Sequence, residues 1–193
     1  MKKLKFVIAA ALVAMSSPAA AQFTSASYEF LKAVRDRDGN KAIELLRSGQ
    51  PGLINMRGAD GNTALVMAVA RRDSDWAAFL ISNGADPNLP AKNGDTPLTT
   101  AARVGFGEAV EWLLSAGAKV DIPNRMGETP LILAVQQRQA QMVKRLLEAG
   151  ADPDKTDTAA GLSARDYAAR DTRSRQMLQL IEAKKPKRAS ATN

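Results

Sequence analysis

The chemistry open to this chain is limited first by two residue types that it lacks. Among its 193 residues there is no His and no Cys. Thiol nucleophiles, imidazole bases and disulfides are therefore excluded, and so are the usual zinc sites, which are built largely from Cys and His. A catalytic centre would have to be assembled from carboxylates, amines and backbone loops alone.

Three segments could carry such chemistry, and each has a simpler structural explanation. Gly105-Phe106-Gly107 lacks the Lys and Ser/Thr of a phosphate-binding loop, so we predict a turn between two helices. Asp73 and Asp75 would face different ways on a helix, and they favour the start of one. The aspartates at 152, 154 and 157 lack the central Gly and terminal Glu of a calcium loop. We predict no catalytic residue, no cofactor and no metal site.

The net charge of +7 is carried by the two ends of the chain. Lys2, Lys3 and Lys5 lie at the start, and four basic residues lie between positions 184 and 188. The stretch from 22 to 183 holds 20 basic and 20 acidic residues, so its net charge is zero. A nucleic-acid-binding domain would carry excess positive charge on a folded face. We therefore expect no nucleic-acid partner.

The first 21 residues have the organisation of a secretory signal peptide. Three lysines precede an apolar run, Phe6–Met15, and small residues follow up to Ala19-Ala20-Ala21. The run of 10 residues is too short to span a bilayer, which needs about 20 in a helix. We expect cleavage after Ala21 and a bacterial, periplasmic location, with no transmembrane segment in the rest of the chain.

The organisation of the chain is set by a repeat of 33 residues. The motif GNTAL begins at Gly61, GDTPL at Gly94 and GETPL at Gly127, and the glycines at 84, 117 and 150 keep the same step. Thr followed by Pro is typical of a helix start, and Gly after an apolar helix is typical of a left-handed C-terminal cap. Each unit is therefore predicted to be a pair of helices joined to the next pair by a turn.

The motifs T-P-L-x-x-A-A and L-L-x-x-G-A-D, in phase over three units, are similar to those of the ankyrin-repeat family. The resemblance implies an all-α solenoid of about five helix pairs and a monomeric protein-binding module. Together with the N-terminal pattern and the charge distribution, the resemblance divides the chain as follows: a signal peptide at 1–21, an N-terminal capping repeat and linker at 22–57, three repeats at 58–156, a C-terminal capping repeat at 157–183, and a basic, disordered tail at 184–193.

One departure from the family pattern concerns the residue after T-P-L. The family usually places a His there that links neighbouring repeats by hydrogen bonds, whereas this chain has Val66, Thr99 and Ile132. We expect the hydrogen-bond network between repeats to be weaker, or replaced by apolar contacts.

The resemblance also implies a binding surface, since family members usually bind proteins on the concave face formed by loop tips and inner helices. These positions are expected to be exposed because stacking leaves them free. Carried over by position, the candidate partner-binding residues are Asp60, Asn62, Arg71, Lys92, Asn93, Asp95, Arg103, Val104, Arg125, Met126, Glu128, Gln136 and Gln137.

We therefore predict a non-catalytic protein that binds another protein outside the cytoplasm, as an accessory or assembly factor. Two alternatives stay open. One is an inhibitor or immunity-type protein that blocks a toxin or hydrolase. The other is a tether in which the basic tail makes weak contact with an anionic surface.

Overall fold

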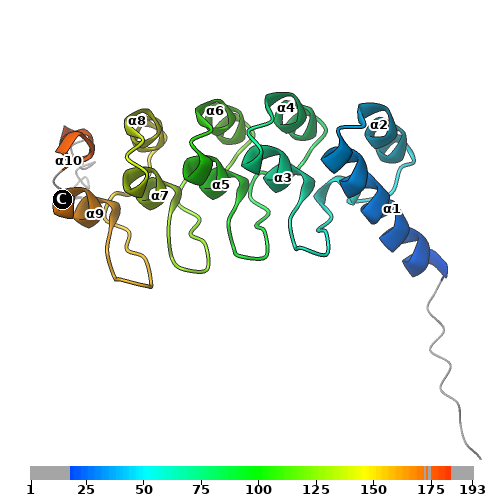
Figure 1. The fold of residues 1–193 in the computed structure, drawn as a ribbon, viewed down its shortest axis with the longest axis horizontal. Coiled ribbons are helices and arrows are strands. Elements are labelled where there is room, and N and C mark those ends of the chain that lie inside the picture. The colour runs from blue at the N-terminus through cyan, green and yellow to red at the C-terminus, as the bar shows by residue number, and fades with distance from the viewer. Residues whose placement is uncertain (1–17, 172, 174, 184–193) are drawn as a thin grey trace, which may run out of the picture.

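The chain folds into a row of helix pairs (Figure 1). The computed structural model describes residues 18–171, 173 and 175–183, and regular structure within them is helical, with isolated β-bridges in place of strands. The helices are α1 (Pro18–Asp36), α2 (Gly39–Arg47), a short 3-10 helix (Leu53–Asn55), α3 (Ala64–Ala70), α4 (Ser74–Ser82), α5 (Pro97–Val104), α6 (Gly107–Ser115), α7 (Pro130–Gln136), α8 (Ala140–Glu148), α9 (Ala164–Arg170) and α10 (Arg175–Ala183).

The pairs stack side by side into two layers of helices and one row of loops. The inner helices α1, α3, α5, α7 and α9 form one layer, the outer helices α2, α4, α6, α8 and α10 the other, and the loops project from the inner side (Figure 1). The predicted all-α architecture with five helix pairs is confirmed. Residues 1–17 of the predicted signal peptide and all of the predicted tail lie outside the described residues.

The inner helices of the three central repeats start as the repeat motif predicts. Thr63, Thr96 and Thr129 each accept a hydrogen bond through Oγ1 from the backbone amide three residues later. In α5 and α7 a proline follows directly, at the first helical position. Its missing N–H costs no hydrogen bond there, because an N–H at this position has no partner within the helix. Ser163 begins α9 in the same way and forms a reciprocal capping box with Asp166. Local sequence therefore defines the helix starts.

The core is made of small and medium-sized side chains at repeating positions. Alanines allow the inner helices to approach closely, and leucines from both layers fill the space between them. Ala68, Ala101, Ala134, Leu65, Leu98, Leu131, Leu80, Leu113 and Leu146 are all buried. Trp76 is buried and its ring meets Phe79 edge-on at 5.4 Å, while Phe79 and Trp112 are only half-buried. Within the described residues, no helix is both long and apolar enough to cross a membrane.

The glycine that opens each repeat motif is required both by its backbone angle and by packing. Gly61, Gly94 and Gly127 have φ between +77° and +85°, where a Cβ would be strained. The next loop also lies against each of them: a Cβ on Gly94 would lie 2.6 Å from the backbone N of Arg125. Gly117, at the end of α6, has φ +90° as predicted, but no atom lies within 4 Å of its Cβ position.

These two kinds of glycine give a matched pair of substitutions. Gly94→Ala and Gly117→Ala share the strain of a left-handed alanine, about 1 kcal/mol. Only Gly94→Ala also forces two loops apart, so its free energy of unfolding should fall by a further ~1–3 kcal/mol. Urea unfolding of both variants measures the difference. Equal losses would mean that the loops do not pack tightly against each other.

The last loop is closed by a buried carboxylate. Asp157 is buried, and it accepts hydrogen bonds from the amides of Ala160 (2.7 Å) and Gly161 (3.0 Å) and from the Tyr167 hydroxyl (2.6 Å). Burial acts to raise the pKa of Asp157. The hydrogen bonds from Tyr167 and from the loop amides outweigh burial, so the pKa lies below its ordinary value of 3.8.

A lowered carboxylate pKa in the folded state gives stability that is present above the unfolded pKa and lost as pH falls through the folded pKa. Tyr167→Phe removes the strongest side-chain donor to Asp157. It should lower the free energy of unfolding by about 1–2 kcal/mol at pH 7 and shift the acid loss of stability to higher pH. Urea unfolding between pH 7 and pH 3 tests this. If the dependence of unfolding free energy on pH keeps its shape in the variant, the lowered pKa of Asp157 does not depend on Tyr167.

Candidate binding surface

The loop tips are joined to one another, so they form a continuous edge along the molecule. We call this edge the tip ridge; it comprises residues 57–63, 90–96, 123–129 and 156–163. The amide of Arg125 donates to the Asn93 carbonyl (3.4 Å), and that of Thr158 to the Met126 carbonyl (2.9 Å). At the first joint the Arg57 side chain donates to the Pro90 carbonyl. These bonds, together with the glycine contacts, set the spacing between tips.

A polar network centred on Asp95 lies beneath the tip ridge. Its Oδ1 accepts from Arg103 Nη2 and Asn124 Nδ2, both at 3.0 Å, and its Oδ2 accepts from Asn93 Nδ2 at 2.7 Å. Asn124 Nδ2 also donates to Glu128 Oε2 at 2.8 Å, and Arg103 lies 3.5 Å from the same carboxylate. One network therefore links two adjacent repeats.

The network corrects two of the sequence-based expectations of exposure. Asp95 and Glu128 were expected at the surface, but the structure buries them, with 4% and 9% exposure. A buried carboxylate needs a charged partner, and Arg103 supplies it from α5. Burial acts to lower the pKa of Arg103, and the ion pairs with Asp95 and Glu128 outweigh it, so the pKa is raised. Arg103 itself is exposed, as expected, but its guanidinium is occupied by these two carboxylates.

The network also bears on the expectation that hydrogen bonding between repeats is weaker where the family's histidine is missing. Val66 and Ile132 are buried, as the predicted replacement by apolar contacts requires, and the Thr99 hydroxyl bonds back to Thr96. Polar links between repeats are still present, but they lie nearer the tips. The sequence analysis missed Asn124, which stands three residues before Gly127, where the preceding unit has Ala91. Aligning the units at that position would have revealed the added amide.

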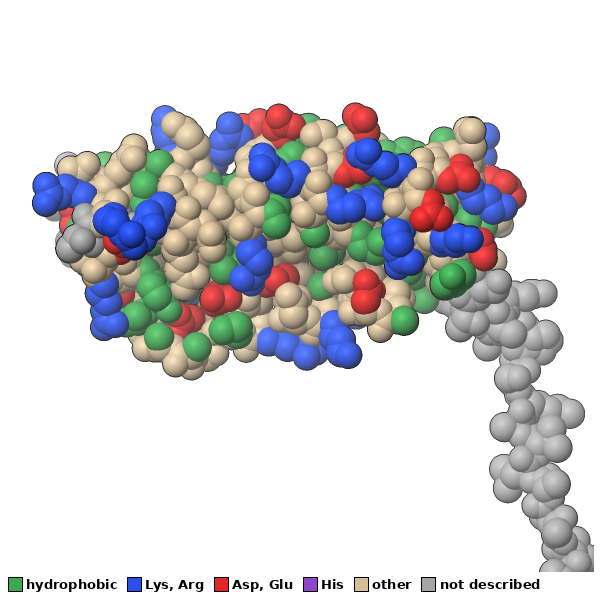
Figure 2. Space-filling view, in the orientation of Figure 1, with side chains coloured by type: hydrophobic (Ala, Val, Ile, Leu, Met, Phe, Trp, Pro, Cys, Tyr) green, Lys and Arg blue, Asp and Glu red, His purple; other side chains and the backbone are tan. Residues whose placement is uncertain are grey.

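Four predicted residues do lie exposed and close together on the tip ridge. Lys92 and Arg125 are exposed, and neither side chain makes an ion pair or hydrogen bond with any residue that the structure describes. Met126 is 54% exposed, although it is hydrophobic. Asn93 is exposed beside them, with its amide held by Asp95. Figure 2 shows basic and hydrophobic side chains along the edge that the tips form.

Other predicted residues hold the fold together locally. Asp60 is exposed, but its carboxylate accepts hydrogen bonds from the backbone amide and from the side chain of Asn62. These bonds, chiefly the one from the backbone amide, lower the pKa of Asp60. The Arg71 guanidinium donates to the carbonyls of Val34 and Arg35 at the end of α1. Both sets of contacts occupy the polar groups that a partner would use.

The remaining three predicted residues lie at the ends of inner helices α5 and α7 and differ in exposure. Val104 is partly buried against the core, Gln136 is half-buried and Gln137 is exposed. In the part of the chain that the structure describes, no group of three acidic side chains is arranged to hold a metal ion. Asp154, from the segment considered for calcium, instead pairs with Arg165 at 2.7 Å.

Stacked helix pairs with a continuous ridge of loop tips define an α-helical repeat solenoid, a class whose repeats contact mainly their neighbours. A family model described as ankyrin repeats (3 copies) matches residues 30–124 and, in an overlapping second match, residues 65–157. The chain belongs to the ankyrin-repeat family, whose members are generally protein–protein interaction modules. No curated protein matches the sequence.

The polar network can be tested with a matched pair of carboxylates. Asp95→Asn keeps the side-chain shape but removes the charge that holds Arg103, so the free energy of unfolding should fall by about 1.5–3 kcal/mol. Asp60→Asn is the control, because the Asp60 carboxylate bonds only within its own tip. Chemical denaturation of both variants provides the measurement. An equal loss of unfolding free energy in both variants would show that the network between repeats contributes no more stability than hydrogen bonds within one tip.

Proposed function

We propose that this ankyrin-repeat protein is a non-catalytic accessory or assembly factor that binds a partner protein along the tip ridge, outside the cytoplasm. The observation that carries the proposal is the group of Lys92, Arg125 and Met126. The two cations have no hydrogen bond or ion pair with any described residue, they lie with the exposed Met126 on adjacent tips, and stacking fixes the distance between those tips.

The chemistry of this group suggests the kind of partner surface that fits it. A free guanidinium binds carboxylates in a defined geometry, and an exposed Met adapts to an apolar pocket. We therefore expect the partner to present acidic side chains around a small apolar pocket. Because the tips are rigidly spaced, little conformational entropy is lost when they bind.

The location outside the cytoplasm rests on the N-terminal sequence. The lysines, the apolar run and the small residues before Gln22 have the order of a cleavable signal peptide. The proposed junction after Ala21 falls within α1. Cleavage there keeps the large buried side chains of α1, Phe30, Leu31 and Val34, in the mature chain.

The proposal predicts a specific loss of binding. Immobilised protein should capture a stoichiometric partner from an envelope extract of the source organism. Arg125→Glu and Met126→Asp should each weaken that complex at least ~10-fold, because a reversed charge or a buried carboxylate would face the partner. Titration calorimetry with the purified partner gives the dissociation constants.

Arg47→Glu is the matched control, since Arg47 is exposed on outer helix α2 and its side chain makes no hydrogen bond or ion pair with any described residue. The Arg47→Glu variant should bind the partner with the same affinity as the unaltered protein. Binding that survives both ridge substitutions would place the partner elsewhere on the molecule. The partner's own activity, measured with and without this protein, separates an assembly factor from an inhibitor.

A further inference from the structure

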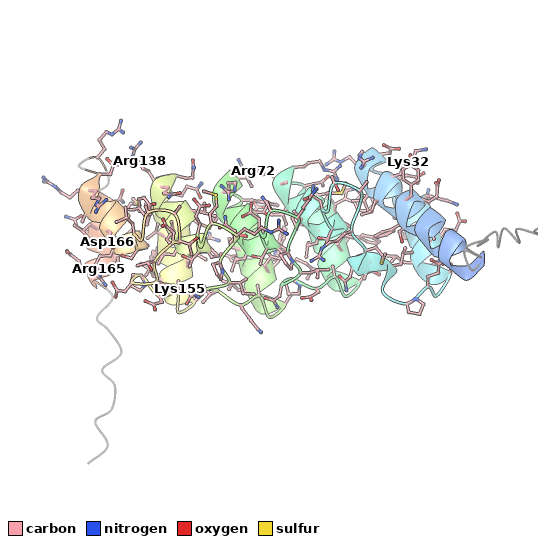
Figure 3. The ribbon with its side chains drawn as sticks, turned by 90° about the horizontal axis from the view of Figure 1, so that it is seen from below. Lys32, Arg72, Arg138, Lys155, Arg165 and Asp166 are labelled. Carbon is pink, nitrogen blue, oxygen red and sulfur yellow. The ribbon has the colours of Figure 1, made fainter. Side chains whose placement is uncertain are left out.

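The turns that lead from inner to outer helices contain an uncommon backbone feature. In the described chain, the residues other than glycine with positive φ are all arginines: Arg37 (φ +61°), Arg72 (φ +55°) and Arg138 (φ +54°). Each stands directly before the N-cap residue of an outer helix, where the turn before α6 has Gly105. Figure 3 shows Arg72 and Arg138 along the same long edge of the stack. A side chain is strained in this conformation, so each arginine needs a contact that offsets the strain.

Two of the three arginines make such a contact with the next repeat. Arg37 pairs with Asp73 of the following turn, with Nη2 2.7 Å from Oδ2. Arg138 pairs with Asp171 in the same way, at 2.6 Å. In both pairs the arginine Nε also donates to the same carboxylate oxygen. A guanidinium at this turn position therefore reaches across the joint and binds a carboxylate there.

Arg72 has no equivalent contact. The two positions that supply the carboxylate in the other joints hold Gly105 and Phe106 in the turn that follows Arg72. The carboxylate of that turn, Glu108, accepts a hydrogen bond from Ser74 Oγ at 3.1 Å. The Arg72 side chain is exposed and makes no hydrogen bond or ion pair with any described residue. Within the part of the chain that the structure describes, nothing offsets the strain at Arg72.

The charge around Arg72 leaves room for a further carboxylate. Arg71 Nη2 lies 3.7 Å from Asp73 Oδ2, the oxygen that Arg37 also binds, so one carboxylate serves two arginines. Hydrogen bonds to two carbonyls at the end of α1 fix the Arg71 guanidinium in this place. Asp75 is exposed in the first turn of α4. The group of three arginines and two aspartates therefore keeps one positive charge in excess.

We propose that Arg72 binds an Asp or Glu side chain of the partner protein, which takes the place of the carboxylate that Arg37 and Arg138 find in the next repeat. A guanidinium and a carboxylate form a bidentate pair of defined geometry. The inference rests on the proposed function, because it takes the same partner, and it adds a second anchor at the turns between inner and outer helices. The strain at Arg72 is then offset in the complex instead of in the free protein.

Unfolding of the free protein tests whether Arg72 has an internal role. Arg72→Gly removes the strain and loses no contact, so its midpoint of urea unfolding should rise by about 0.3 M. Arg138→Gly is the matched control: it relieves the same strain but loses the pair with Asp171, so its midpoint should lie below that of Arg72→Gly. A midpoint of Arg72→Gly that stays the same or falls would mean that Arg72 stabilises the free protein, and would overturn the proposal.

Binding tests the second anchor. With the partner captured from the envelope extract and purified, Arg72→Gly should raise the dissociation constant at least ~10-fold, and Arg138→Gly should leave it unchanged. An unchanged constant for Arg72→Gly, in a complex that Arg125→Glu weakens, would overturn this inference alone. A loss with Arg72→Gly and none with Arg125→Glu would keep the anchor at Arg72 and overturn the tip ridge as the site. An extract that yields no partner would overturn both proposals.

Discussion

The whole structure depends on the contact between a left-handed glycine at one loop tip and the backbone of the next. Gly94 has a positive φ and no room for a Cβ, so the following tip can approach it closely. The contact recurs at a fixed step, and it brings the Asn93 carbonyl within reach of the Arg125 amide. This repeated close approach sets the spacing of the tips, while the buried alanines and leucines set the packing of the helices.

Close approach of the tips has an electrostatic consequence. It buries polar groups between repeats, and buried carboxylates are tolerated only with partners. Asp95 meets this requirement through Arg103 and Asn124, and Glu128 shares both. Side chains that look free in a repeat alignment are therefore occupied in the stack. The residues left for a partner include Lys92 and Arg125, which are exposed although the stems of their side chains lie against the glycine of the preceding tip.

The fold could be predicted almost entirely from the sequence, because its signals are local. Thr96 followed by Pro97 favours the start of a helix through contacts within a few residues, and the glycine at 117 favours the end of one. The binding surface could be predicted only in part. Whether Asp95 is exposed depends on Asn124, which lies 29 positions further along the chain. The position of a residue within its own repeat does not predict such a contact, because the partner residue belongs to another repeat.

A solenoid also needs its two ends completed, and here the ends differ. At the first repeat, α1 is long, and Phe30 and Val34 are fully buried, so the core is closed by apolar side chains. At the last repeat, Asp157 closes its own loop through Tyr167, yet the glycine that follows keeps the geometry of an internal joint. Glycine adopts a positive φ without strain, so Gly161 is stable in this conformation without a covering segment. The last repeat is therefore closed by polar contacts within its own loop, whereas the first is closed by apolar packing.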